Sequence, residues 1–175
     1  MGIAWDTARP LTWSDFRGVA PPTSGNFTEP AAIHMTIHWR VSYSATSANG
    51  RTWSGRVETA EVTNVMSPAL SWAVPGQVNP LILLHEQTHF DLNEVYRRKL
   101  ENALLCVQAQ GSSQQGVVDA LNERVHAIAQ QLLDRLVAVQ DIYDAETSPG
   151  INQAAQNRWK DQVSLWLSDP SLAPS

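Results

Sequence analysis

Two histidines and a glutamate in one short stretch carry the clearest chemical signal in this sequence. They form the pattern His85-Glu86-x-x-His89, within the stretch from Leu81 to Asp91. Residues four apart lie only about 40° apart around an α-helix, so both imidazoles can face one metal ion. Glu86 lies about 100° from His85, where its carboxylate can reach a metal-bound water without being a ligand itself. The pattern predicts a zinc site with Glu86 as the general base.

The residues around this motif predict the helix that such a site needs. Asn79-Pro80 is typical of a helix start, with Asn as the N-cap and Pro at the first helical position. The apolar residues that follow indicate a helix that enters the core. We expect this helix to run from residue 80 to about residue 109 and to end at Gly111.

A catalytic zinc site also needs a third protein ligand, with a fourth position left open. Leu92 and Val95 occupy the positions where the metzincin extension has Gly and His, which excludes that subclass. Asp91 and Glu94 are close in sequence, but both point away from the two histidines on a regular helix. Asp91 is kept as a candidate for packing beside the site.

The acidic end of a second predicted helix is a better source of this ligand. An apolar stripe at helical spacing predicts a helix from near Ser113 to about Tyr143. If this helix packs antiparallel to the first, at about 1.5 Å per residue, the segment from Tyr143 to Thr147 returns to the level of His89. Asp144 and Glu146 are both chemically suitable ligands, and Tyr143 could donate a hydrogen bond to an oxyanion. The alternative is a solvated acidic helix end.

The remaining histidines and the single cysteine have simpler interpretations. His34 and His38 share one face of a predicted strand, where they either line a cleft or, as is more common, face solvent. Glu123 and His126 lie off the apolar stripe of the second helix and are expected at the surface. Cys106 lies among apolar residues and is expected to be buried; as the only cysteine, it excludes an internal disulfide.

The first half of the chain predicts a small antiparallel sheet. Residues 31–44 alternate between apolar and polar side chains, which is typical of a strand with one buried face. Asn49-Gly50 is a strong turn signal, and a second strand is expected from Thr52 to Val65. A short edge strand is expected within residues 70–74, in a connection rich in turn residues.

We therefore expect an α+β fold with one domain over residues 1–175. Residues 1–79 are loop-rich and β, residues 80–167 are helical with a third helix over about 152–167, and residues 168–175 form a frayed tail. A chain of 175 residues is long enough for a real core.

Composition limits the partners. The formal net charge is −5 and no basic run occurs, which argues against nucleic acid or an anionic membrane surface. No apolar stretch approaches the roughly 20 residues needed to span a bilayer, and the first residues do not form a signal peptide. We expect a protein that is either cytoplasmic or secreted with its signal removed.

Four blocks of the sequence resemble a family of bacterial proteins, often secreted, that are regarded as zinc-dependent proteases. The blocks are Leu11-Thr-Trp-Ser-Asp-Phe-Arg-Gly18 with Pro21-Pro22, His85-Glu-Gln-Thr-His-Phe-Asp91, Tyr143-Asp-Ala-Glu-Thr147, and Gly150 with Gln156 and Trp159. They span most of the chain, in the order found in the family.

The resemblance implies a zincin-like fold that hydrolyses peptide or protein substrates. It makes His85 and His89 zinc ligands, Glu86 the base and Asp144 the third ligand, with Glu146 as the second choice. The sequence departs from the family at Pro149, where a His is expected after the Thr of the third block. This departure motivates an alternative function: a catalytically impaired zincin-fold domain that binds a metal or another protein. A structural domain with an accidental motif is the third possibility.

Overall fold

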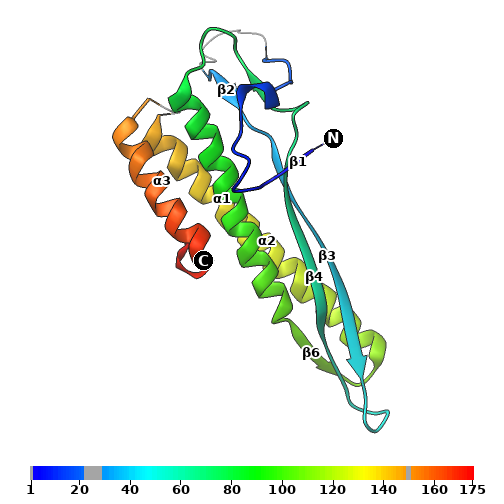
Figure 1. Ribbon diagram of the computed structural model, residues 1–175. Helices are drawn as coiled ribbons and strands as arrows, with labels where there is room; N and C mark the ends of the chain where they lie inside the picture. Colours follow the sequence, from blue (N-terminus) through cyan, green and yellow to red (C-terminus); the bar gives the residue numbers. More distant parts are fainter. Residues whose placement is uncertain (1, 22–28, 149–150) are drawn as a thin grey trace.

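The computed structural model describes residues 2–21, 29–148 and 151–175 of the chain. The chain forms small antiparallel sheets and three helices, which confirms the expected α+β class. Two long helices lie side by side along the molecule, and a β-hairpin extends beside them towards the far end (Figure 1). Pro149, where the sequence departs from the pattern of the family that it resembles, lies outside the described residues.

The hairpin is the largest part of the β structure. It consists of β3 (Met35–Thr46) and β4 (Trp53–Met66), which pair antiparallel from Met35 opposite Met66 to Thr46 opposite Ser54. Two shorter strands, β1 (Ile3–Ala4) and β6 (Gln108–Gly111), pair with opposite ends of β4. The predicted hairpin is confirmed. The turn contains Gly50 with φ +69°, a conformation that glycine adopts without steric cost.

A second, two-stranded sheet lies near the start of the first long helix. It pairs β2 (Ala31–Ala32) with β5 (Trp72–Ala73) in antiparallel register. The short strand expected within residues 70–74 is therefore present, but it pairs apart from the hairpin. Upstream, residues Trp13–Asp15 form a 3₁₀ turn, η1.

The motif helix, α1 (Pro80–Leu105), begins as predicted. The Asn79 side chain accepts hydrogen bonds from the N–H groups of Leu81 and Ile82, and Pro80 is the first helical residue. The predicted end near residue 109 was wrong. The chain leaves the helix after Leu105 because the residues of β6 pair with the first residues of β4. Cys106 lies at this exit and is exposed, not buried as expected.

The second and third helices are α2 (Gln114–Thr147) and α3 (Gln153–Ser168). α3 packs against α1 at the end where α2 finishes (Figure 1). The tail is ordered instead of frayed. It forms a second 3₁₀ turn, η2 (Pro170–Leu172), after which Ala173 is buried and its carbonyl accepts a hydrogen bond from Lys99 Nζ. Tyr96 donates its hydroxyl proton to the carbonyl of Pro174.

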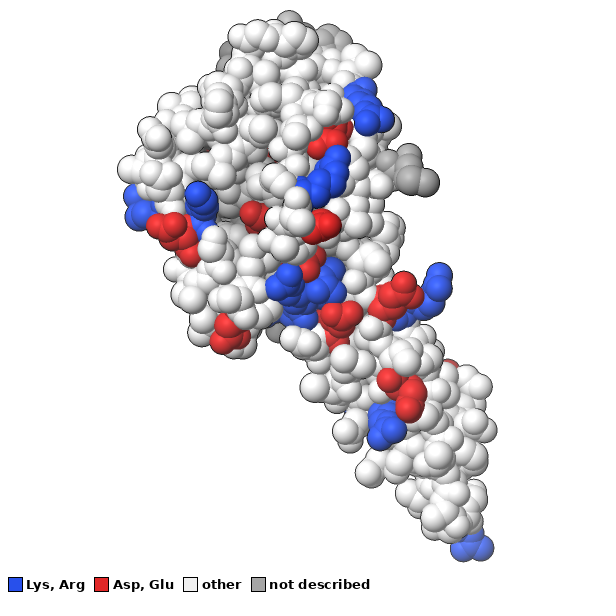
Figure 2. All heavy atoms as spheres, in the orientation of Figure 1, with Lys and Arg blue, Asp and Glu red and all other residues white. Residues whose placement is uncertain are grey.

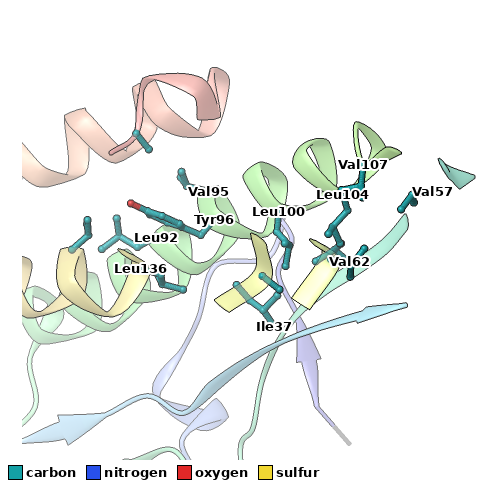
Figure 3. Packing of buried hydrophobic residues seen from close by; sticks show 14 of the residues in the cluster. Ile37, Val57, Val62, Leu92, Val95, Tyr96, Leu100, Leu104, Val107 and Leu136 are labelled. Atoms are coloured by element: carbon teal, nitrogen blue, oxygen red, sulfur yellow. The ribbon is translucent and has the colours of Figure 1, made fainter. Parts of the chain in front are cut away.

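One face of α1 forms the centre of the main core. Apolar side chains of α1 pack together with side chains of the hairpin and of α2 (Figure 3). The labelled members are Ile37, Val57, Val62, Leu92, Val95, Tyr96, Leu100, Leu104, Val107 and Leu136. Full burial of one such side chain stabilises a fold by about 1.5–3 kcal/mol, so this packing fixes the position of α1 relative to α2.

A smaller cluster joins the N-terminal segment to α1. Leu11 and Phe16 pack with Met66 and Phe90. The N-terminal segment therefore covers one side of the core.

The surface carries charges of both signs. On the face shown in Figure 2, Lys and Arg lie among Asp and Glu, and no large area has a single sign. None of the helices in the described part of the chain is both long and apolar enough to cross a bilayer.

Candidate metal centre

Two helices bring three possible metal ligands together. His85 and His89 lie in the first half of α1, and Asp144 lies in the last turn of α2. The Nε2 atoms of the two histidines are 3.1 Å apart. Asp144 Oδ1 lies 3.1 Å from Nε2 of His85 and 2.8 Å from Nε2 of His89. Within the described residues, this is the group of His, Cys, Asp and Glu side chains that could hold a metal ion.

The three atoms fit a zinc ion. Separations of 2.8, 3.1 and 3.1 Å leave room for a point about 2.0–2.1 Å from all three, which is the length of a Zn–N or Zn–O bond. Two imidazoles and one carboxylate also form a donor set of the kind found in catalytic zinc sites, where the fourth position stays open.

The surroundings of Asp144 Oδ1 are suited to a bound cation. Its Oδ1 atom is buried, and within the described part of the chain no group donates it a hydrogen bond of acceptable geometry, although two imidazole nitrogens lie close by. Burial acts to raise the pKa of Asp144, but the adjacent His85 and His89 outweigh it and hold the pKa below its ordinary value. The carboxylate is therefore charged and turned towards the two histidines.

The other ring nitrogen of each histidine has an oxygen partner. His85 Nδ1 lies 3.3 Å from Thr147 Oγ1, which donates its own proton to the carbonyl of Tyr143 and so accepts from the ring. His89 Nδ1 lies 2.6 Å from Gln140 Oε1. Such partners orient metal-binding imidazoles and leave the lone pair on Nε2. Both histidines thus direct Nε2 towards the centre.

Glu86 lies beside the centre but is held differently. Its side chain is buried, and its Oε2 accepts a hydrogen bond of 2.9 Å from the main-chain N–H of Ile33. Burial raises the pKa of Glu86, and the nearby histidines oppose this rise only in part. A carboxyl group with a raised pKa is suited to accept and return a proton near neutral pH.

A cavity of about 270 Å³ opens onto these residues. Its walls are formed by the strand segment of β2 with its neighbours, by α1 and by α2. The lining residues are Glu29, Ala31, Ala32, Ile33, Met35, His85, Glu86, His89, Gln140 and Asp144.

Tyr143 does not occupy the position expected of an oxyanion donor. Its ring stacks on His85, with 4.7 Å between ring centroids. Its hydroxyl is buried, donates to the carbonyl of His85 and accepts from Gln156 Nε2. Burial also raises the pKa of Tyr143, so this hydroxyl stays protonated. The geometry favours a packing role for Tyr143, because its ring supports His85 while its hydroxyl is not part of the cavity wall.

The other acidic candidates lie outside the centre. Glu146 is exposed and accepts a hydrogen bond from Trp159 Nε1, so it is not brought to the histidines. Asp91 accepts from Trp5 Nε1 and Gln87, which is the packing role kept for it. Glu94 is buried, points away from the histidines as expected and pairs with two arginines.

The polar residues expected at the surface are found there. His34 and His38 are exposed and take no part in the group of possible ligands. Glu123 and His126 are exposed on α2.

Sequence reasoning missed the residues that hold the ligands in place. Gln140 and Thr147 precede and follow Asp144 by four and three residues, so they share its face of α2. That spacing was the available signal. No sequence signal pointed to the N–H of Ile33 as a partner of Glu86, because a main-chain contact of this kind depends on tertiary structure.

Comparison with known proteins places the chain in a bacterial family. The model of a family described as "Bacterial protein of unknown function (DUF922)" matches residues 15–150. This range is more than half of the chain and contains His85, Glu86, His89 and Asp144. No curated protein and no solved structure matches the chain.

Proposed function

The chain belongs to the bacterial family of unknown function DUF922, and we propose that it is a zinc-dependent peptidase with a zincin-like active site. The observation that carries the proposal is the convergence of Nε2 of His85, Nε2 of His89 and Oδ1 of Asp144 beside a buried Glu86. These are the residue types that bind zinc and transfer protons in peptidases with the HExxH pattern.

In this proposal, each residue has a defined task. His85, His89 and Asp144 would hold the zinc ion, which when bound supplies a Lewis acid for a peptide carbonyl and a water molecule. Glu86 takes a proton from the attacking water and returns it to the leaving amine. The N–H of Ile33 holds Oε2 of Glu86, which fixes the direction in which the carboxylate exchanges the proton.

The cavity wall suggests how a substrate is aligned. β2 pairs with β5 along one edge, and within the described residues no strand pairs with its other edge. Ala31 and Ala32 line the cavity, with Ala31 buried and Ala32 half-buried. An extended peptide can add to such an edge through main-chain hydrogen bonds. We therefore place the peptide substrate along β2.

A second candidate function is a metal-binding domain with little or no hydrolytic activity. One observation favours it: among the described residues that line the cavity, the side-chain donors are His85, His89 and Gln140. No Tyr or Arg of the described chain joins them, so a developing oxyanion would depend on the metal alone for stabilisation.

Metal content and turnover separate these possibilities. Purified protein is expected to contain about one zinc ion per chain by elemental mass spectrometry, as a three-ligand site requires, and to lose it to a chelator. Glu86→Gln should keep the metal and abolish cleavage of a peptide library, because the amide cannot accept the proton. A double variant, His85→Ala with His89→Ala, should lose both the bound metal and the cleavage of peptides.

The outcomes of this experiment are distinct. Zinc without cleavage in the wild-type protein would favour the metal-binding domain. Cleavage retained by Glu86→Gln would refute the role of Glu86. Absence of metal after reconstitution would remove both functions and leave an accidental motif.

A further inference from the structure

A chain of side-chain amides leads from the hairpin to His89. Gln140 Nε2 on α2 donates to Asn93 Oδ1 on α1 over 3.0 Å. Asn93 Nδ2 donates to Asn64 Oδ1 on β4 over 3.4 Å, and Asn64 Nδ2 donates to the main-chain carbonyl of Phe90 over 3.2 Å. Asn64 and Asn93 are both buried, and Gln140 is half-buried. The fourth link is the 2.6 Å contact between Gln140 Oε1 and His89 Nδ1.

The chain of amides can run in only one direction. A primary amide has one end that donates and one that accepts, and the carbonyl of Phe90 only accepts. Asn64 must therefore turn Nδ2 towards Phe90, which leaves its Oδ1 for Asn93. In the same way, Asn93 donates through Nδ2 to Asn64, so its Oδ1 must accept from Nε2 of Gln140. Oε1 of Gln140 then faces Nδ1 of His89, and this nitrogen must carry the proton that Oε1 accepts.

We propose that Asn64, Asn93 and Gln140 are positioning residues that fix His89 as the Nδ1–H tautomer and so keep the lone pair of Nε2 free for a metal ion. The metal side of this inference rests on the proposed function, whereas the tautomer is a property of the protein without metal. His85 reaches the same tautomer by a separate route, through Thr147.

The alternative tautomer of His89, with the proton on Nε2, could not bind a metal ion through Nε2. A proton on Nε2 would point into the centre, where Nε2 of His85 lies 3.1 Å and Oδ1 of Asp144 lies 2.8 Å from Nε2 of His89. Nε2 would then hold a proton in place of the lone pair that a metal ion needs. The amides therefore select between two neutral forms of one ring, only one of which can bind metal through Nε2.

Nitrogen NMR on the metal-free protein tests the tautomer directly. With ¹⁵N-labelled histidine, at an alkaline pH where the ring is neutral, wild-type His89 is expected to carry its proton on Nδ1. Gln140→Leu removes the acceptor and Asn93→Leu removes the link that orients it. Each should let the Nε2–H form appear and should weaken zinc binding by about 10- to 100-fold, as lost outer-shell partners do.

Two further variants control for general damage. Gln140→Glu keeps an acceptor for Nδ1 and should retain the wild-type tautomer. Gln130→Leu makes the same change as Gln140→Leu at an exposed position of α2 and should alter neither the tautomer nor zinc binding. If Asn93→Leu fails to fold, the contrast between Gln140→Leu and Gln140→Glu still decides the question, because Gln140 is only half-buried.

Each outcome has one meaning. Wild-type His89 protonated on Nε2 would overturn the inference without any variant, and so would a folded Gln140→Leu protein with an unchanged tautomer. The expected tautomers in a protein that binds no zinc would support the inference and refute the proposed function. Tight zinc binding that is insensitive to the Gln140 and Asn93 variants would overturn the inference alone.

Discussion

Asp144 Oδ1 at the end of α2 lies 2.8 Å from His89 Nε2 on α1, although the two residues belong to different helices. This approach depends on the antiparallel packing of α1 and α2, whose shared apolar face includes Leu92, Leu136 and Val139. The core of the protein therefore sets the spacing of the candidate metal ligands. A shift of either helix along its axis would separate the carboxylate from the imidazoles.

Replacement of Asp144 should affect metal binding far more than replacement of Glu146. Asp144→Ala removes one of three candidate ligands, and we expect zinc affinity to fall by more than about 100-fold, beyond the usual loss for an outer-shell partner. Glu146→Ala is the matched control, since Glu146 is exposed and bonded to Trp159. Competition with a chromogenic chelator measures both. Equal losses in the two variants, or none in Asp144→Ala, would contradict the assignment.

Local sequence signals predicted which helices and strands form, but not the residue at which each one ends. Asn79 and Pro80 marked the start of α1 correctly because a helix cap is a property of adjacent residues. The end of α1 was placed too late, because the strand at Gln108–Gly111 exists only through pairing with β4. The strand preference of such a segment is set by its neighbours in space. The same reason explains the tail, which is ordered by contacts of Ala173 and Pro174 with α1.

The candidate site was predictable to the extent that it follows helix geometry. His85 and His89 are one turn apart, and counting residues along two antiparallel helices placed the segment from Tyr143 to Thr147, which contains both Asp144 and Glu146, at the same level. The position of the Tyr143 hydroxyl did not follow, because it depends on Gln156 of α3. The partner of Glu86 likewise comes from a distant main-chain group.

The packing of α1 against the hairpin should dominate stability. Leu104 is completely buried in the main core, whereas its neighbour Leu105 is 47% exposed. Leu104→Ala is expected to lower the free energy of unfolding by about 2–5 kcal/mol, as core truncations of this kind do. Leu105→Ala should change it by less than about 0.5 kcal/mol. Urea unfolding followed by circular dichroism measures the difference, and similar losses in both variants would contradict the described packing.

Asp15, which is not one of the candidate metal ligands, should make stability depend on pH. Burial acts to raise the pKa of Asp15, but hydrogen bonds from Arg9 and Thr12 outweigh it and lower the pKa below its ordinary value. Arg9 approaches to 2.7 Å and the Thr12 N–H to 2.9 Å. In the unfolded chain these partners are lost and the pKa returns to its ordinary value. The folded state therefore binds the proton more weakly.

The sign of the effect follows from this difference. The contribution of Asp15 is fully present above its ordinary pKa and is lost as the pH falls through the lowered value of the folded state. Asp15→Asn should therefore be less stable than wild type at neutral pH, by about 1.5–3 kcal/mol for a hydrogen bond to a charged group. The difference in the free energy of unfolding between wild type and Asp15→Asn should become smaller at acidic pH. Urea unfolding of both across an acidic pH series measures it, with Asp6→Asn, an exposed carboxylate of the same segment, as the control. A gap that stays constant with pH would mean that the charge of Asp15 does not stabilise the fold.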